Sequence, residues 1–256
     1  MNDSEVLHYQ SNYLTHVIFR VDFPKILRLD RTDPPAQFQD TIIGLFPHLN
    51  ERKTRSLSID MQNSSAVAKQ EEMPQWEFMN KEKTQKIIIE STSFVQEFLE
   101  YTHFPEFFEV LKKTLESFFQ IYPMPICTRL GLRYINKIKM DTGDPLNWEN
   151  LLFAPLYEAN IKLISDPNTL KRSMHSLESK EGKYNLRFNY GIFNSEYPNP
   201  VARKEFILDY DCYYDEEEET SRVFDIAKEF NVIITKWFEK SICDDLRSKM
   251  GVTTHG

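Results

Sequence analysis

The sequence predicts an α+β fold made of two tandem β-α-β-β-β-α units that form antiparallel sheet(s) with helices packed on one face. Two observations support this. The order strand, helix, three strands, helix occurs twice along the 256 residues, and short similar segments such as Ile-Ile-Ile-Glu at 87–90 and Phe-Ile-Leu-Asp at 206–209 keep their place in it. We therefore expect an internal duplication, with units at 1–123 and 124–256 joined without a flexible linker in one body.

The first half opens with an apolar, β-branched strand at 14–23. A helix at 35–46 follows Asp33-Pro34, where Asp33 is placed to cap it and a proline suits the first turn. Strands are then expected at 55–61, 75–80 and 85–94, the last two as a hairpin around residues 81–83. The half closes with an amphipathic helix at 104–121, which carries a stripe of aromatic and leucine residues.

The second half repeats this order with a long strand at 126–140. A helix at 146–158 follows, which Pro155 is expected to kink or end. Two strands joined around Glu181-Gly182, one further strand and a single long terminal helix complete the prediction, at 171–180, 183–193, 204–214 and 222–249. Either side-by-side or face-to-face sheets would leave a ligand cleft at the pseudo-twofold axis.

Composition excludes several classes of protein. The chain has 31 Lys and Arg against 39 Asp and Glu, a formal charge of −8, which argues against a nonspecific DNA-coating protein. No stretch approaches the roughly 18 apolar residues of a membrane helix, and the first ten residues lack the features of a secretory signal. We therefore expect a cytoplasmic protein without membrane contact.

Cofactor motifs are not found in the sequence. Three cysteines are too few and too scattered for a disulfide framework or a zinc site, and only 7 glycines make a phosphate-cradling loop improbable. No P-loop, dinucleotide fingerprint or nucleophile-elbow motif occurs. The sequence thus predicts no cofactor and favours a protein that is not an enzyme, although it leaves the question of catalysis open.

The most distinctive segment is Arg129-Leu-Gly-Leu-Arg-Tyr-Ile-Asn136. It resembles the central "GLRYIN" strand of a sporadically distributed, uncharacterised prokaryotic protein family of about this length. Ile207-Leu-Asp-Tyr-Asp211 is similar to the later strand of that family, which ends in Asp-x-Asp. The resemblance implies a broad fold and no particular reaction, and the patchy occurrence of the family suggests a mobile or defence-associated gene.

This segment also supplies the first candidate ligand-binding residues. On a strand, Arg129 and Arg133 share one face with Gly131 between them, so two guanidinium groups could hold a phosphate or carboxylate. The alternative is that Arg133 pairs internally with an aspartate of a neighbouring strand. Tyr134 and Asn136 occupy the other face, where they would meet the helices as core or turn residues.

Asp209 and Asp211 are the second candidate pair, because both lie on one face of a predicted strand. An Asp-x-Asp pair can hold Mg²⁺ if a third carboxylate, such as Glu90 or Glu205, joins it. Internal ion pairing with Arg133 or Lys137 is the favoured alternative, so no metal is assigned.

The acidic run Asp-Glu-Glu-Glu-Glu at 215–219 is expected to be a solvated, mobile loop before the last helix. It could instead dock on a basic protein partner. Together, these features favour a binding module that recognises a partner protein or a small anionic ligand. The alternatives are a Mg-dependent, nuclease-like or phosphoryl-processing enzyme that uses Asp209 and Asp211, and a nucleic-acid-binding protein.

Overall fold

The computed structural model describes residues 8–30, 33–62 and 65–253. Its main element is an antiparallel sheet of nine strands, which confirms the α+β class. The strands are β2 (Leu14–Asp22), β3 (His48–Gln62), β4 (Ser65–Met79), β5 (Gln85–Glu90), β6 (Ser93–Phe98), β8 (Arg129–Met140), β9 (Ser173–Glu181), β10 (Tyr184–Ile192) and β11 (Lys204–Tyr214). Across the sheet their order is β3-β4-β5-β6-β2-β8-β11-β10-β9.

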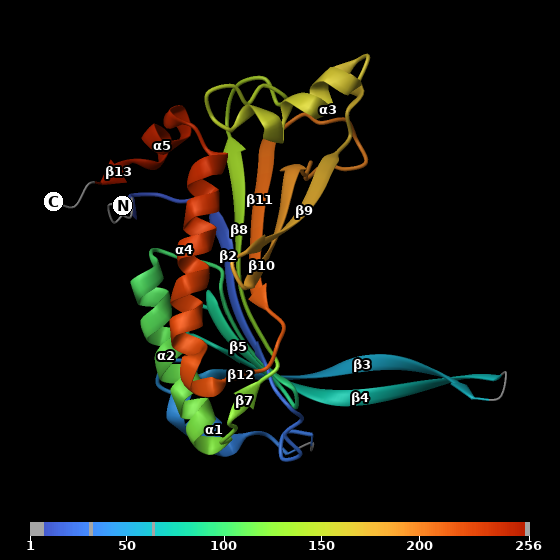
Figure 1. The fold of residues 1–256 in the computed structure, drawn as a ribbon, viewed down its shortest axis with the longest axis vertical. Helices are drawn as coiled ribbons and strands as arrows, with labels where there is room; N and C mark the ends of the chain where they lie inside the picture. The colour runs from blue at the N-terminus through green and yellow to red at the C-terminus, as the bar shows by residue number, and fades with distance from the viewer. Residues whose placement is uncertain (1–7, 31–32, 63–64, 254–256) are drawn as a thin grey trace.

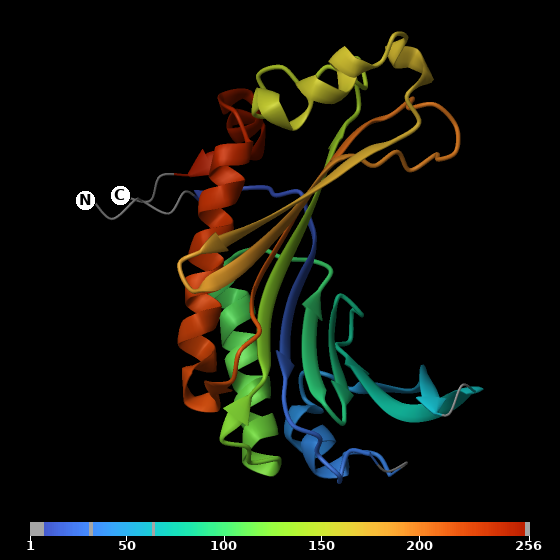
Figure 2. The same cartoon turned by 45° about the vertical axis from the view of Figure 1, so that its right-hand side comes forward.

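Three helices cover one face of this sheet (Figures 1 and 2): α1 (Ala36–Ile42), α2 (Phe104–Ile121) and α4 (Val223–Ser241). The predicted stripe of α2 is buried, including Phe107, Leu111 and Phe118, because helix spacing places these side chains on one side. On α4, Ile226, Phe230 and Ile234 are buried in the same way. Alternate residues of the central strands meet these helices, so the hydrophobic core lies between the sheet and the helices.

Smaller elements complete the chain. Helix α3 (Glu158–Leu163) lies at one end of the sheet, and α5 (Asp244–Met250) follows α4. The short strands β1 (His8–Tyr9) and β13 (Val252–Thr253) pair with each other, as do β7 (Ile126–Cys127) and β12 (Glu218–Glu219). In the part of the chain that is described, no helix is both long enough and apolar enough to cross a membrane.

The two halves of the chain share one continuous sheet. Strand β2 pairs with β8 at its centre. On one side β2 pairs with β6 of the first half, and on the other β8 pairs with β11 of the second half. The halves therefore lie side by side, one of the two arrangements that the sequence left open. Unit boundaries at 1–123 and 124–256 and an internal duplication stay predictions.

The first half departs from the predicted pattern in two places. The segment predicted as one strand at 85–94 is two strands, β5 and β6, because the chain reverses at residues 91–92. Four strands therefore follow α1 instead of three. Helix α1 ends at Ile42 instead of residue 46, and Asp33 does not cap it: Pro35 holds the N-cap position, without a side-chain hydrogen bond.

The second half differs where two predicted helices are broken. Residues 146–157 are turns and a 3₁₀ turn (Ala154–Leu156), because Asn150 adopts a left-handed backbone conformation and Pro155 has no N–H to donate. The predicted helix at 222–249 is divided into α4 and α5 at Ile242. There the backbone is extended and forms a bridge with Leu152, which takes the chain out of the helix.

The β3–β4 hairpin is longer than its predicted strands at 55–61 and 75–80. Its paired register runs from His48 opposite Met79 to Gln62 opposite Ser65. Strand β5 pairs with β4 only from Trp76 to Met79. Most of the hairpin therefore has no third strand beside it, and it projects from the sheet as a two-stranded ribbon (Figure 1).

Candidate functional site

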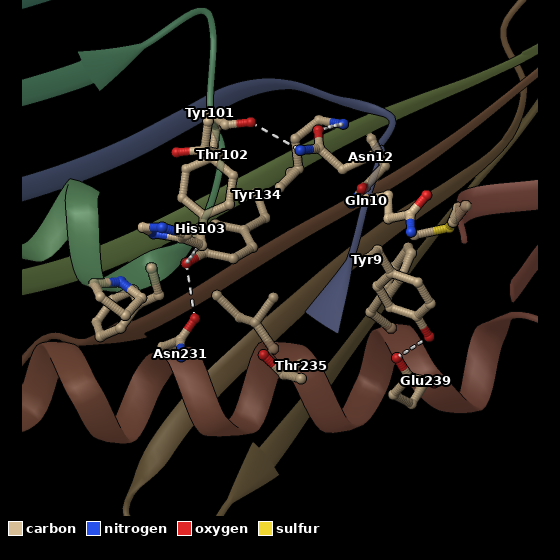
Figure 3. Close-up of a pocket in the computed structure, with 17 residues that line it drawn as sticks. Tyr9, Gln10, Asn12, Tyr101, Thr102, His103, Tyr134, Asn231, Thr235 and Glu239 are labelled. Atoms are coloured by element: carbon tan, nitrogen blue, oxygen red, sulfur yellow. Dashed lines mark hydrogen bonds between the residues drawn. The ribbon is translucent and has the colours of Figure 1, made fainter. Parts of the chain in front are cut away.

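A cavity of about 890 Å³ lies on the helix-covered side of the sheet. Its walls come from β8, from α4, from the chain that leads into α2, and from the elements β1 and α5 near the two ends of the described chain (Figure 3). Most of the lining is aromatic or aliphatic, with a few polar groups among the rings. A cavity of this size and character is typical of small-molecule sites.

The periodicity of two elements explains which side chains reach this cavity. Tyr134 and Asn136 are alternate residues of β8 and point toward α4. Asn231 and Thr235 are four residues apart on α4 and therefore lie on one side of that helix, facing the sheet. The cavity is where polar residues interrupt the otherwise apolar packing between these two elements.

A chain of hydrogen bonds crosses one end of the cavity. The Tyr134 hydroxyl donates to Asn231 Oδ1 at 2.8 Å, and the Tyr101 hydroxyl oxygen lies 3.3 Å from that of Tyr134. Because the Tyr134 proton is directed at Asn231, Tyr101 is the donor of the second bond. The chain runs from Tyr101 to Tyr134 to Asn231, and no described residue pairs with Asn231 Nδ2.

Both phenols of this chain are neutral at physiological pH. Burial raises the pKa of Tyr101 to about 12, although its hydrogen bond to Tyr134 opposes the rise. Burial also raises the pKa of Tyr134 well above its ordinary value, and the neighbouring Tyr101 adds to the effect. The two hydroxyls therefore act as hydrogen-bond donors, and they are poor candidates for a general base.

Two asparagines beside these hydrogen bonds differ in how many of their polar atoms are paired within the protein. Asn12 uses its whole amide within the protein: Nδ2 donates to the Tyr101 carbonyl at 2.8 Å, and Oδ1 accepts from the Leu14 N–H at 3.0 Å. Asn136 is only 4% exposed and donates through Nδ2 to the Leu208 carbonyl at 3.3 Å. No described residue donates to Asn136 Oδ1, so Asn12 is structural and Asn136 retains a hydrogen-bond acceptor.

His103 adds a donor at the same end of the cavity. It is the N-cap of α2, and its Nδ1 accepts from the Glu106 N–H at 3.2 Å. In the neutral ring the proton is then carried by Nε2. His103 lines the cavity and lies with Tyr101 and Tyr134 in Figure 3, so this end holds an N–H donor from the ring.

The far end of the cavity contains its one lining carboxylate, that of Glu239. The Tyr9 hydroxyl donates to Glu239 Oε1 at 2.5 Å, and Arg247 Nε lies 3.0 Å from Oε2 (Figure 3 shows the Tyr9 contact). Burial and Glu239 both raise the pKa of Tyr9, which keeps the phenol protonated. The charge of Glu239 is thus balanced by Arg247, and this end is closed by β1.

The residues predicted as a site lie on opposite faces of the sheet. Tyr134 and Asn136 line the cavity, as described above. The two arginines and the two aspartates lie on the face without helices, because they occupy alternate positions of β8 and β11. The structure therefore brings together Arg129, Arg133, Asp209 and Asp211, and separates them from Tyr134 and Asn136.

The helix-free face carries a row of alternating charge. The strand register places residues of opposite charge beside one another across the sheet from β5 to β9, with one isoleucine in the row. In order, this cross-strand charge row is Lys86, Glu97, Ile18, Arg133, Asp211, Arg187 and Glu178. Opposite charges in neighbouring strands stabilise a sheet and fix its register.

The candidate arginines are held by carboxylates within this face. Arg133 forms a bidentate pair with Asp209, with contacts of 2.8 and 2.7 Å, and this pair raises the pKa of the guanidinium. Arg129 lies 3.8 Å from Asp211 and over the ring of Tyr213. Burial raises the pKa of Asp211, whereas the nearby arginines lower it. The positive charge predicted to attract an anion is largely compensated by the protein.

The proposed third carboxylates for a metal are also engaged elsewhere. Glu90 accepts hydrogen bonds from Gln75 at 2.7 Å and Ser93 at 3.0 Å, and Glu205 lies 3.8 Å from Lys137 and from Lys139. No group of three or more His, Cys, Asp or Glu side chains in the described part of the chain could hold a metal ion. The geometry of Asp209 and Asp211 is that of ion pairing.

The acidic run 215–219 is not wholly the solvated loop that the sequence predicts. Its last two residues form β12, which pairs with β7 beside the start of α4. Glu218 lies 3.8 Å from Lys183 and 3.4 Å from Arg222, so its charge is partly balanced. The prediction missed this because β7 comes from a segment about ninety residues earlier, whose approach no local pattern reveals.

Sequence reasoning missed the main polar residues that line the cavity on the side of α2 and α4, among them Tyr101, His103, Asn231 and Thr235. They come from two segments far apart in the chain, and no motif joins them. One signal was present: Asn231 and Thr235 are polar interruptions next to the apolar stripe of the last helix. A buried polar residue needs a partner, which would have marked this helix face for attention.

No protein-family model and no curated protein matches the chain. The family resemblance of residues 129–136 therefore stays a prediction. The case for a function rests on the geometry of the cavity, whose neutral, aromatic and hydrogen-bonding lining is suited to holding a small molecule.

Proposed function

We propose that the protein is a binding protein that holds a small molecule in the cavity between α2, α4 and β8. One observation carries the proposal. The hydrogen-bond chain from Tyr101 through Tyr134 ends inside the cavity at Asn231, whose Nδ2 has no partner among the described residues. An amide donor that lines a cavity and has no partner among the described residues is available to a ligand that accepts a hydrogen bond from it.

The chemistry of the lining supports binding over catalysis. Tyr101 and Tyr134 are phenols with raised pKa values, so neither supplies a base near neutral pH. Amides and a capping histidine complete the polar end. Such groups orient a ligand through hydrogen bonds, and the rings around them provide apolar contact area.

The other functions suggested by the sequence have weaker support. A small anion at Arg129 and Arg133 would compete with Asp209 and Asp211, and a metal at these aspartates would displace the arginines. A protein partner at 215–219 would meet a run in which Glu218 already lies beside Lys183 and Arg222. The cavity remains the site with polar groups still available for a ligand.

A fragment screen by ligand-observed NMR tests this function. Thr235 lines the cavity, so Thr235→Trp should narrow it and weaken the signals of fragments that bind the wild-type protein there. Val232 is on the same helix, is 63% exposed and lies outside the cavity, so Val232→Trp is the matched control and should leave them unchanged.

Circular dichroism and thermal unfolding show whether each variant is folded. If folded Thr235→Trp retains the same fragments with the same affinities, or if no fragment binds the wild-type protein, the cavity is not a binding site and the proposed function is wrong.

A further inference from the structure

The ligand of the cavity can be narrowed to a chemical class, an inference that rests on the proposed function. We infer that the ligand is an uncharged aromatic ring with a hydrogen-bond acceptor next to a donor on one edge, as in nucleobases and pyridones. The inference depends on two features of the lining: the balance of its charges and the arrangement of its free polar groups.

Charge balance makes an uncharged ligand the best fit. The lining carboxylate of Glu239 is engaged by Tyr9 and by Arg247, and no described lysine or arginine lines the cavity. An ionised ligand would leave water for a site whose one lining charge is already compensated by Arg247, which is costly. A neutral ring avoids this cost and gains contact area against the aromatic walls.

The free polar groups of the lining are of both kinds. Asn231 Nδ2 and His103 Nε2 are donors, and Asn136 Oδ1 is an acceptor. Figure 3 shows Asn231 and His103 beside the two phenols, and Asn136 lies two residues after Tyr134 on the same face of β8. A ligand that satisfies these groups must offer an acceptor as well as a donor.

The phenol rings set the shape of the ligand. The ring centroids of Tyr101 and Tyr134 are 5.7 Å apart, and the two hydroxyls point into the hydrogen-bond chain. Both residues line the cavity, so an aromatic ligand would contact them. Amide side chains pair well with the combined donor and acceptor on the edge of a nucleobase, as Asn and Gln do with adenine. A heteroaromatic ring with such an edge therefore fits the cavity.

Four small probes test the class: uracil, adenine, orotate and toluene. Orotate is uracil with a carboxylate, and toluene is a ring without a polar edge. Titrations followed by ligand-observed NMR should show uracil or adenine binding about tenfold more tightly than toluene, as expected for one additional hydrogen bond in a cavity. Orotate should bind more weakly than uracil because its carboxylate must leave water. Binding should weaken in Thr235→Trp, which narrows the cavity and thereby locates the binding there.

Asn231→Asp tests the polar edge without removing the contact to Tyr134. The substitution keeps an oxygen that accepts from Tyr134 and replaces only the free amide N–H, so the better base should bind about tenfold or more weakly. Asn168→Asp introduces the same charge at an exposed position outside the cavity and should have no effect.

The outcomes separate the two proposals. If toluene or orotate binds in the cavity as well as the bases do, or if Asn231→Asp binds them normally, the ligand class is wrong and the binding function stands. If none of the four probes binds the wild-type protein, the ligand class is again wrong. The fragment screen then shows whether the cavity binds a small molecule at all. Loss of base binding in Asn231→Asp but not in Asn168→Asp supports the class.

Discussion

The hydroxyl of Tyr134 links the strand at the centre of the sheet to helix α4. It donates to Asn231 and accepts from Tyr101, so one side chain organises the polar end of the cavity. Asn12 holds the loop of Tyr101 from the other side through its amide. Tyr134 and Asn12 therefore hold Asn231 and Tyr101 in position through hydrogen bonds within the protein.

Replacement of Tyr134 by phenylalanine should show how much these hydrogen bonds contribute to the free energy of unfolding. Tyr134→Phe leaves Asn231 Oδ1 and the Tyr101 hydroxyl without a partner, and we expect the free energy of unfolding in urea to fall by about 1–2 kcal/mol. Tyr197→Phe removes a hydroxyl from an exposed ring and should change it by less than about 0.5 kcal/mol. Equal effects for both variants would show that the hydrogen-bond chain is not stabilising.

The raised pKa of Tyr101 predicts a specific alkaline instability. Its phenol keeps its proton to about pH 12 in the folded state, whereas the unfolded chain releases it near pH 10. Between these values the unfolded state binds fewer protons, so stability falls by about 1.4 kcal/mol per pH unit from this group. Below pH 10 its contribution is constant.

Tyr101→Phe isolates this contribution from the other tyrosines. Urea unfolding of the wild type and Tyr101→Phe at pH 9, 10 and 11 should give a stability difference that narrows as the pH rises above 10. A difference that stays constant over this range would contradict the predicted pKa.

At the scale of elements, the helix-free face of the sheet is organised by ion pairs. The cross-strand charge row gives each β strand from β8 to β9 an oppositely charged neighbour, and the Arg133–Asp209 pair ties β8 to β11. Asp209 is largely buried, with 8% of its side chain exposed, whereas the Arg187–Glu178 pair near the sheet edge is open to solvent. The two pairs should therefore differ in their contribution to stability.

Arg133→Met should lower the free energy of unfolding by about 2 kcal/mol, because it leaves the buried carboxylate of Asp209 without its charged partner and with only the hydrogen bond from Asn189. The figure is below that for fully buried pairs because the Arg133 side chain is 42% exposed. Arg187→Met, the matched control, should cost less than about 1 kcal/mol. A larger loss for Arg187→Met than for Arg133→Met would contradict this assignment.

Periodicity predicted the elements that are long and regular. The strands at 14–22 and 204–214 and the helix at 104–121 follow alternating or helical patterns of apolar residues, and they occur close to the predicted bounds. The turn at 91–92 and the end of α4 at Ser241 were missed. The end of α4 depends on tertiary pairing, since Ile242 leaves the helix to bridge Leu152, a contact that no local pattern encodes.

The site could be predicted only in part, for the same reason. Tyr134 and Asn136 were selected from one strand, and their direction toward the helices followed from alternation. Their partner Asn231 lies almost a hundred residues later, so the hydrogen bond that gives the cavity its polar end required the fold. The ion pair of Arg133 was predicted as an alternative, because an arginine and an aspartate on neighbouring strands of one sheet tend to pair.

At the scale of the whole molecule, the cavity is shared by both halves of the chain. Tyr101 and His103 come from the first half, and Tyr134 and Asn231 come from the second. The halves meet through β2 and β8 in one continuous sheet. The site therefore exists only when both halves are folded together.

This sharing predicts a single cooperative unfolding transition. Calorimetry should give one peak with equal calorimetric and van't Hoff enthalpies, because neither half can keep its part of the central sheet without the other. Two resolved transitions would show that the halves fold as independent domains.

The most direct test of the binding proposal is the side-chain amide spectrum of the ¹⁵N-labelled protein during titration with the tightest ligand found in the fragment screen. We predict that the amide resonance of Asn231 shifts and saturates with the ligand, together with that of Asn136. The amides of Asn185 and Asn189, on the helix-free face, should stay unchanged. Saturable shifts at Asn185 and Asn189, with Asn231 unmoved, would contradict the assignment of the cavity as the binding site.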